Sequence, residues 1–321
     1  MKTLWIGLTV LLAIVAIVLL IAYICFRMAF YVPKKRPEAK EFPIPDGEEY
    51  LPYREQMIQW IKETRALPHE YMQITSFDGL TLRGRYYEYA PGAPIELMLH
   101  GYRGESERDM SGGVQRCFAL GRSALVVDQR ACGRSEGTVI TFGAKEHIDC
   151  LCWVQHMLER FGPDIKIILT GISMGAATVV MASGCQLPDN VIGVLADCGC
   201  SSAKEIIRLV IRNRIGLPPD LAYPFVRLGA RLFGGFDLNA ANAVDAIRST
   251  KVPVIFYHGD ADDFVPCYMS RDMYDACPSR KKLVTIPGAA HGLSFPKDPD
   301  TYLQTLADFF GPDASCHAKE M

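Results

Sequence analysis

The sequence lacks several features that mark common functional classes. Its formal net charge is only -2 and its pI is about 6.4, and this near balance gives no support for nucleic-acid binding. We find no internal repeat, which argues against a repeat array. Neither an H-E-x-x-H motif nor a P-loop is present, so two common metal and nucleotide signatures are missing. We therefore expect no cofactor and no metal.

Charge is also missing from a long stretch near the N-terminus. Residues 3–26 carry none, and about 20 apolar residues in a helix can cross the hydrocarbon core of a bilayer. Trp5 and Tyr23 lie near its ends, where amphipathic rings favour the interface. A cleaved signal peptide would have a shorter apolar region and small residues at its cleavage site, which "AYICFRMAF" does not offer. We expect residues 1–30 to form an uncleaved transmembrane anchor.

The charges that flank the anchor favour a cytoplasmic catalytic domain. Lys2 precedes the span, whereas basic residues are more numerous after it. These are Arg27, Lys34, Lys35, Arg36 and Lys40. The 11 cysteines are an odd number, so they cannot all form disulfides, and a chain of this size does not need disulfides for stability. The cysteine content therefore also agrees with a cytoplasmic domain. In contrast, a short N-terminus with one Lys is also typical of an export signal, which would place the domain on the opposite side of the membrane.

The remaining chain divides into three parts by composition. Residues 31–68 are predicted to be a proline-rich spacer followed by an amphipathic helix, with Met57, Trp60 and Ile61 on one face. Residues 69–312 form one large domain, since 49% of the whole chain is hydrophobic. Residues 313–321 form a polar tail.

Short apolar segments alternate with helical segments from residue 70 onward. Two strands around a turn at Asp78 and Gly79 come first. Six segments of four to seven residues, rich in Val, Ile and Leu, have the composition of strands covered on both faces. They lie within 95–101, 123–129, 165–171, 190–199, 252–260 and 281–288. This alternation predicts an α/β fold, with a mostly parallel central sheet and helices on both faces.

Residues 201–249 interrupt this alternation and contain no strand pattern. Ser202 and Glu205 form a capping-box signature at the start of a helix, and prolines interrupt the region further on. We expect a small helical lid after the fourth parallel strand. Its basic residues are Lys204, Arg208, Arg212, Arg214, Arg227 and Arg231. A solvated helix face is the default interpretation, and a lid lying on anionic lipid, admitting acyl chains, is the alternative hypothesis.

A tight turn is predicted where the third parallel segment ends. In "GISMG", Gly171 and Gly175 flank Ser173 at a spacing of two residues. Such a strand-to-helix turn exposes the serine hydroxyl at the positive end of a helix. The pentapeptide alone is also compatible with an ordinary Gly/Ser-rich turn. Its position after a strand of a parallel sheet, where ligands bind, favours a nucleophile.

A serine nucleophile requires an imidazole base and a carboxylate that orients it. Of the seven histidines, only His291 lies in the loop after the last strand and before the last helix. His100 and His258 end strands, but each precedes a glycine and is expected to brace a turn. The others precede the first strand, lie within a helix or belong to the tail; they are His69, His147, His156 and His317.

The acid should follow the preceding strand, where the sequence offers three aspartates. These are Asp260, Asp262 and Asp263, among which spacing alone cannot decide. Asp197 is an outside candidate, with capping of the lid as its structural alternative. We expect the backbone N–H groups of Met174 and Tyr102 to bind the oxyanion. The side chain of Tyr102 is a separate candidate for lining the pocket.

Taken in order, "LHGYRG", "VVDQRACGRSEG", "TFGAKEHIDCLCW", "GISMGAAT", "HGDADDFVP" and "GAAHG" resemble the α/β-hydrolase superfamily. The resemblance covers roughly residues 70–311. Within the superfamily the chain is most similar to bacterial membrane-anchored hydrolases of the serine aminopeptidase-like or esterase-like type. The resemblance implies Asp262 as the acid, and a structural role for the loop from Asp128 to Ser135, in which Ala131 and Cys132 replace the usual Gly-His.

The resulting prediction is a serine hydrolase acting through a Ser173, His291 and Asp262 triad and an acyl-enzyme. A carboxylic ester is favoured over a peptide, because the lid offers no carboxylate cluster for a free amino group. The alternatives are aminopeptidase-like peptide hydrolysis and a non-enzymatic binding protein on the same scaffold. A metal site at Cys150, Cys152 and His156 is disfavoured, because residues two apart on a helix point in different directions.

Overall fold

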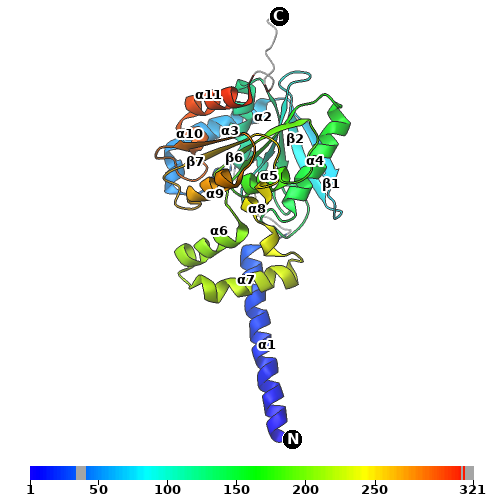
Figure 1. Cartoon of the computed structure of the whole chain (residues 1–321), viewed down its shortest axis with the longest axis vertical. Helices are drawn as coiled ribbons and strands as arrows, with labels where there is room; N and C mark the ends of the chain where they lie inside the picture. The colour runs from blue at the N-terminus through cyan, green and yellow to red at the C-terminus, as the bar shows by residue number, and fades with distance from the viewer. Residues whose placement is uncertain (34–40, 312–313, 315–321) are drawn as a thin grey trace, which may run out of the picture.

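The computed structural model describes residues 1–33, 41–311 and 314, and it contains one central sheet (Figure 1). The eight strands have the order β1-β2-β4-β3-β5-β6-β7-β8. They are β1 Glu70–Thr75, β2 Thr81–Tyr87, β3 Ile95–Leu99, β4 Ser123–Asp128, β5 Ile167–Ile172, β6 Val191–Asp197, β7 Val254–Gly259 and β8 Lys281–Ile286. β2 pairs antiparallel with both β1 and β4, whereas all pairs from β4 to β8 are parallel. The predicted mostly parallel sheet is therefore confirmed.

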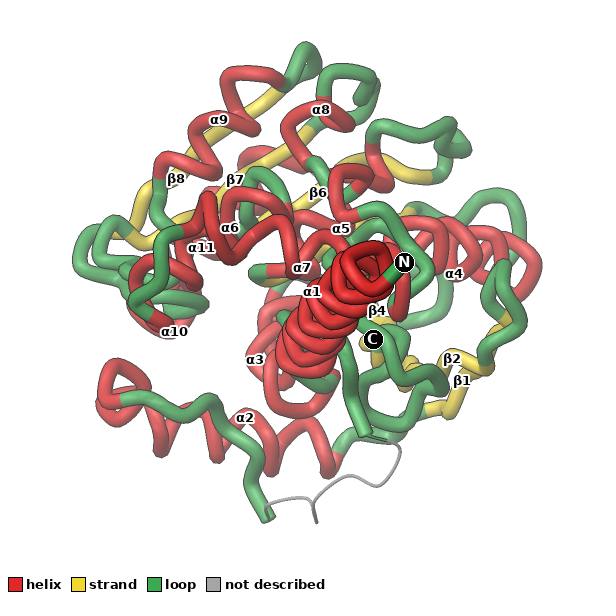
Figure 2. The backbone as a smooth tube through the Cα atoms, turned by 90° about the horizontal axis from the view of Figure 1, so that it is seen from below, coloured by secondary structure: helices red, strands yellow, loops and turns green. Residues whose placement is uncertain are grey.

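Helices cover both faces of this sheet, and Figure 2 separates the two layers. One layer holds α4 Glu146–Phe161, α5 Met174–Ser183, α8 Ala243–Ile247 and α9 Tyr268–Ala276. The other holds α2 Arg54–Ala66, α3 Ser106–Ala119, α10 Ser294–Lys297 and α11 Pro299–Phe310. Within β5, Leu169 joins the apolar cluster on the first side and Ile168 the one on the second. This alternation is why the strand sequence is apolar throughout.

One charged group lies in the middle of the sheet. The Glu96 side chain on β3 is completely buried and accepts hydrogen bonds from Arg116, from Arg122 at 2.7 Å and from Thr170 at 2.9 Å. Burial alone would raise the pKa of Glu96, but the two guanidinium groups outweigh it and hold the pKa at about 2. The carboxylate therefore stays ionised and ties α3, the end of the α3–β4 loop and β5 together.

The segment predicted as a lid is helical. α6 Ala203–Val210 begins at Ser202, whose hydroxyl accepts a hydrogen bond from the Glu205 amide, as the capping-box signature indicates. A π-helical turn, Ile211–Ile215, leads to α7 Pro219–Phe233. The prolines do not break the region as expected: the helix starts at Pro219, where a missing N–H costs nothing, and accommodates Pro224.

The N-terminal helix, α1 Lys2–Ala29, projects from the domain and packs on α7 near its own C-terminal end (Figure 1). It is the one helix in the described ranges that is long and apolar enough to cross a membrane, and its most apolar window is almost wholly exposed. In contrast, Ala22, Phe26 and Phe30 are buried. A Cβ on Gly229 of α7 would lie 2.3 Å from the Ala22 carbonyl oxygen, so the two backbones touch. The end of α1 is thus part of the folded domain.

Candidate active site

The turn between β5 and α5 holds Ser173 in a strained conformation, with φ 57° and ψ -118°. Both flanking glycines are required for steric reasons. A Cβ on Gly171 would lie 2.2 Å from Gly175 backbone atoms, and one on Gly175 would lie 2.0 Å from the Leu99 carbonyl oxygen. The close approach of β3, β5 and α5 therefore explains the Gly-x-Ser-x-Gly spacing and exposes the serine at a helix N-terminus.

The structure brings the three predicted side chains into one hydrogen-bonded row. His291 Nε2 lies 2.9 Å from Ser173 Oγ, and His291 Nδ1 lies 2.7 Å from Asp262 Oδ2. The carboxylate can only accept, so Nδ1 carries the proton and Nε2 is free to accept the serine proton. The three residues follow β5, β7 and β8, at the carboxyl edge of the sheet.

Two further contacts fix the Asp262 carboxylate. Its Oδ1 accepts the backbone N–H groups of Phe264, at 3.0 Å, and Val265, at 2.8 Å. Burial raises the pKa of Asp262, but hydrogen bonds from His258 and His291 outweigh this effect and hold the pKa well below its usual range. The group is therefore an ionised, fixed acceptor for the imidazole.

The other candidate aspartates lie elsewhere. Asp260 accepts the Gly288 N–H at 2.6 Å, and Asp263 is solvent-exposed beside Arg214 at 3.4 Å. Asp197 is buried and accepts hydrogen bonds from Ser294, at 2.8 Å, and Tyr302, at 3.0 Å. It neither reaches His291 nor caps the lid, because Ser202 is the capping residue.

The loop after β3, residues 100–104, passes directly over the serine. A Cβ on Gly101 would lie 3.4 Å from Ser173 Cβ. His100 braces this loop as expected, since its Nδ1 lies 2.8 Å from the Gly101 carbonyl and its Nε2 accepts the Gln129 amide at 3.0 Å. Within the described residues, the N–H groups of Tyr102 and Met174 have no hydrogen-bond partner, so both are available as donors.

A cavity of about 230 Å³ opens beside Ser173 and is lined mainly by apolar side chains. Part of its wall comes from the segment before the sheet, where Trp60 stacks on Phe295 with ring centres 5.3 Å apart and packs against Gly112 of α3. From the same segment, the Tyr50 hydroxyl donates to the His291 carbonyl at 2.9 Å. The predicted amphipathic helix thus shapes the pocket, a role that its sequence pattern did not indicate.

Cys198 was also not anticipated at this site. Its thiol, the Asp262 carboxylate and the His291 imidazole lie within 4.8 Å of one another, a spacing that a metal ion could bridge. However, burial raises the pKa of Cys198 well above its ordinary value, which favours the neutral thiol over the thiolate that metals bind. The imidazole and carboxylate are moreover already bonded to each other.

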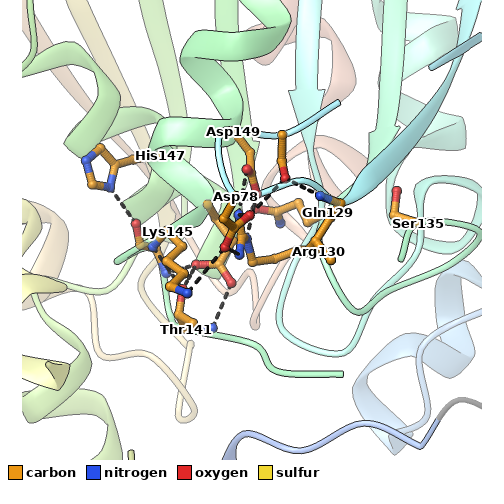
Figure 3. Close-up of polar contacts among 12 residues, drawn as sticks. Asp78, Gln129, Arg130, Ser135, Thr141, Lys145, His147 and Asp149 are labelled. Atoms are coloured by element: carbon orange, nitrogen blue, oxygen red, sulfur yellow. Dashed lines mark hydrogen bonds and ion pairs between the residues drawn. The ribbon is translucent and has the colours of Figure 1, made fainter. Parts of the chain in front are cut away.

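The loop from Asp128 to Ser135 is held by polar contacts, part of which Figure 3 shows, and its Ala131 and Cys132 pack with Met174 and Tyr102. Asp128 accepts the amides of Ser106 and Arg134, at 2.9 Å each. Arg130 bridges Asp149, at 2.7 Å, and Asp78, at 3.0 Å. Ala131 has a φ of 61°, a left-handed value that costs a non-glycine residue some strain.

The disfavoured metal ligands on α4 do not form a cluster. Cys150 is completely buried, Cys152 is half-buried, and the His156 ring lies edge-on to Trp153 at 6.0 Å. His258 braces its loop through Ser270 and the Val265 carbonyl, each at 2.7 Å. His317 lies outside the described residues.

Several proteins are similar to this chain in sequence. It is 26% identical to the protein YqkD of Bacillus subtilis over 59% of this chain and 62% of that one, and 24% identical to the protein bem46 of Schizosaccharomyces pombe over 76% and 77%. A 25% identical relative in Saccharomyces cerevisiae, YNL320W, is named a membrane protein and is matched over 61% of its length. The chain thus spans about three fifths of YqkD and YNL320W.

Solved structures show the same architecture. The Pyrococcus furiosus esterase Pf2001 superposes with a TM-score of 0.65 at 20% identity, covering 88% of this chain and 97% of that one. The esterase Est1E of Butyrivibrio proteoclasticus gives 0.56 at 22% identity, over 74% and 96%. The sequence profile described as the alpha/beta hydrolase family matches residues 97–305. Because this match covers well over half of the chain, the protein belongs to the alpha/beta hydrolase family.

Proposed function

We propose that the protein is a serine hydrolase that cleaves carboxylic esters through an acyl-enzyme. The observation that carries this proposal is the position of His291, hydrogen-bonded to Ser173 Oγ through Nε2 and to Asp262 through Nδ1. Ser173 Oγ attacks the ester carbonyl while Nε2 takes its proton, and the imidazolium then gives that proton to the leaving alkoxide. Water, activated by the same imidazole, releases the acid and regenerates the serine.

The negative charge that develops on the carbonyl oxygen needs donors that are already in place. The backbone N–H groups of Tyr102 and Met174 are our candidates, since both lie next to the serine and lack another partner among the described residues. Met174 is also the first residue of α5, so the helix N-terminus adds positive potential.

The pocket favours a small ester over a peptide with a free amino group. Its volume of about 230 Å³ is below the range of about 300–1,000 Å³ for drug-sized ligands. An α-amino group would require a free carboxylate, but both lining aspartates are engaged. Asp109 pairs with Arg108 at 2.6 Å and accepts the Gly101 amide, and Asp197 is bonded to two hydroxyls.

The α1 helix is proposed to anchor the enzyme in a membrane. Residues 2–21 extend about 30 Å at 1.5 Å per residue, which matches the hydrocarbon core, before Ala22 docks on the domain. Removal as a signal peptide would strip the buried Phe26 and Phe30 from their contacts. We retain the expectation of a cytoplasmic domain, which rests on the flanking charges and the cysteine content of the sequence.

The lid is proposed to lie at the membrane surface. α7 crosses α1 at the base of the domain, where α1 leaves it (Figure 1). Leu221, Phe225, Leu228 and Leu232 recur at helical spacing, and the first and last are more than half exposed. The exposed Arg227 lies beside this stripe, so α7 has the composition of an interfacial helix on anionic lipid.

Labelling with a fluorophosphonate probe tests the proposed chemistry. We expect the full chain in detergent to be labelled and the Ser173→Ala variant not to be labelled. p-Nitrophenyl esters of graded chain length, run beside aminoacyl-p-nitroanilides, then give the substrate class, and we expect turnover of short esters only. Failure of the wild-type protein to react would instead favour a binding protein on the hydrolase scaffold.

A further inference from the structure

The loop that carries the proposed oxyanion donor is bonded to the end of the membrane helix. The Tyr102 hydroxyl donates to the Ala29 carbonyl at 2.7 Å. Arg103 Nη2 donates to the carbonyls of Met28, at 2.8 Å, and Tyr31, at 3.2 Å. These three carbonyls lie at the C-terminal end of α1 and just beyond it, where a helix leaves its last acceptors unsatisfied. Two consecutive side chains of one loop thus satisfy them.

Arg103 makes these contacts from an unfavourable backbone conformation. Its φ is 52°, a left-handed value that a non-glycine residue adopts only when its surroundings hold it there. The guanidinium charge also complements the negative end of the α1 dipole. Because Gly104 and Gly101 close the loop by a backbone hydrogen bond of 3.1 Å, a shift at Arg103 would be passed on to the Tyr102 amide between them.

The chain just after α1 is itself fixed to the domain. Phe30 and Val32 exchange backbone hydrogen bonds with residues 138–140, at 2.9 Å and 2.8 Å. The Phe142 ring lies between the rings of Phe30, at 5.8 Å, and Tyr102, at 4.9 Å. Residues 28–32 are therefore bonded both to residues 138–140 and to the loop.

We propose that the C-terminal end of the membrane helix holds the loop of residues 100–104 in its productive position, with Tyr102 and Arg103 as positioning residues. Their side chains bond to α1, and their effect on the reaction passes through the Tyr102 backbone N–H. The anchor would then be part of the catalytic architecture as well as a tether. This inference rests on the proposed ester hydrolysis.

Steady-state kinetics of the full chain in phosphatidylcholine nanodiscs can test the proposal, with turnover normalised to the fraction labelled by fluorophosphonate. Tyr102→Phe removes only the hydroxyl, and Arg103→Met removes the donors together with the positive charge. We expect each to lower kcat for a short p-nitrophenyl ester about tenfold or more, with KM within twofold of wild type. The loss is smaller than the 100- to 1,000-fold typical of deleting an oxyanion donor, because the amide is displaced and not removed. Arg103→Lys, which retains a donor, should recover part of kcat.

The matched control is Tyr23→Phe. The Tyr23 hydroxyl accepts a hydrogen bond from Arg27 at 3.0 Å on the same helix but does not contact the loop, so kcat should not change. The proposal would be overturned if both Tyr102→Phe and Arg103→Met kept the kcat per labelled molecule of the wild-type protein. A fall in their thermal stability would not change this conclusion, because the contacts would then stabilise the fold without affecting the reaction. If the wild-type protein is not labelled at all, the proposed function fails instead, and the two failures are thus distinguishable.

Discussion

Replacing the Asp262 carboxylate by an amide should almost abolish turnover while leaving the fold intact. Asp262 Oδ1 accepts two backbone N–H groups, those of Phe264 and Val265. In Asp262→Asn the single amide oxygen must take this position, because an NH2 group there would face two donors. The NH2 group is therefore directed at His291 Nδ1, 2.7 Å away in the wild-type protein.

This orientation forces the wrong histidine tautomer. Nδ1 must now accept a hydrogen bond, so the ring proton moves to Nε2 and the imidazole can no longer accept the proton of Ser173. Loss of the correct tautomer in such triads lowers kcat by about 10⁴, which corresponds to about 5 kcal/mol in the activation barrier. We expect a loss of that size in initial rates with p-nitrophenyl acetate.

Asp263→Asn is the matched control, because it makes the same chemical change one residue away on an exposed side chain. We expect its kcat to stay within twofold of wild type. The reasoning would be refuted if Asp262→Asn retained more than a tenth of wild-type kcat, or if the two variants lost activity equally.

Four further predictions concern the core and the membrane. Glu96→Gln should destabilise the protein by about 3–5 kcal/mol in urea unfolding, because it leaves buried arginine charge without a partner; an unchanged midpoint would contradict this. Since the pKa of Glu96 falls from an ordinary 4.5 to about 2, its stabilisation should be complete above pH 4.5 and lost as the pH drops through 2, which acid unfolding can follow. Gly229→Leu should separate α7 from α1, because even a Cβ at this position would lie 2.3 Å from the Ala22 carbonyl oxygen. We expect faster proteolysis within α7 of this variant, and an unchanged rate would argue against the contact. In Leu221→Trp, brominated lipid should quench more tryptophan fluorescence than in the wild-type protein, whereas Leu51→Trp, at an exposed position outside the lid, should show no such increase. Equal quenching in the two variants would place α7 away from the bilayer.

The sequence pattern was sufficient to predict those parts of the fold that depend on neighbouring residues in the chain. Strands covered on both faces are predominantly apolar, so the segments around β3 to β7 were recognisable. The edge strand β8 is half-exposed and was recognisable from its short run of Leu, Val and Ile. The turn at Ser173 was recognisable because steric crowding demands glycine at two fixed positions. Elimination by position was sufficient to single out His291, the residue that the structure brings within hydrogen-bond distance of Ser173.

Features that depend on distant contacts were not predictable in this way. Asp260, Asp262 and Asp263 are chemically identical, and only the geometry of the turn directs one of them at His291 while another faces solvent. Similarly, no sequence pattern relates Trp60 to the Gly112 surface on which it packs. The bond from Tyr102 to Ala29 joins residues that are 73 positions apart.

The wall of the pocket that comes from residues 45–61 has a consequence for comparisons across the family. These residues, among them Tyr50 and Trp60, precede the family match, which begins at residue 97. Two proteins that both match the family over this segment can therefore differ in this wall, and with it in the shape of the space beside Ser173.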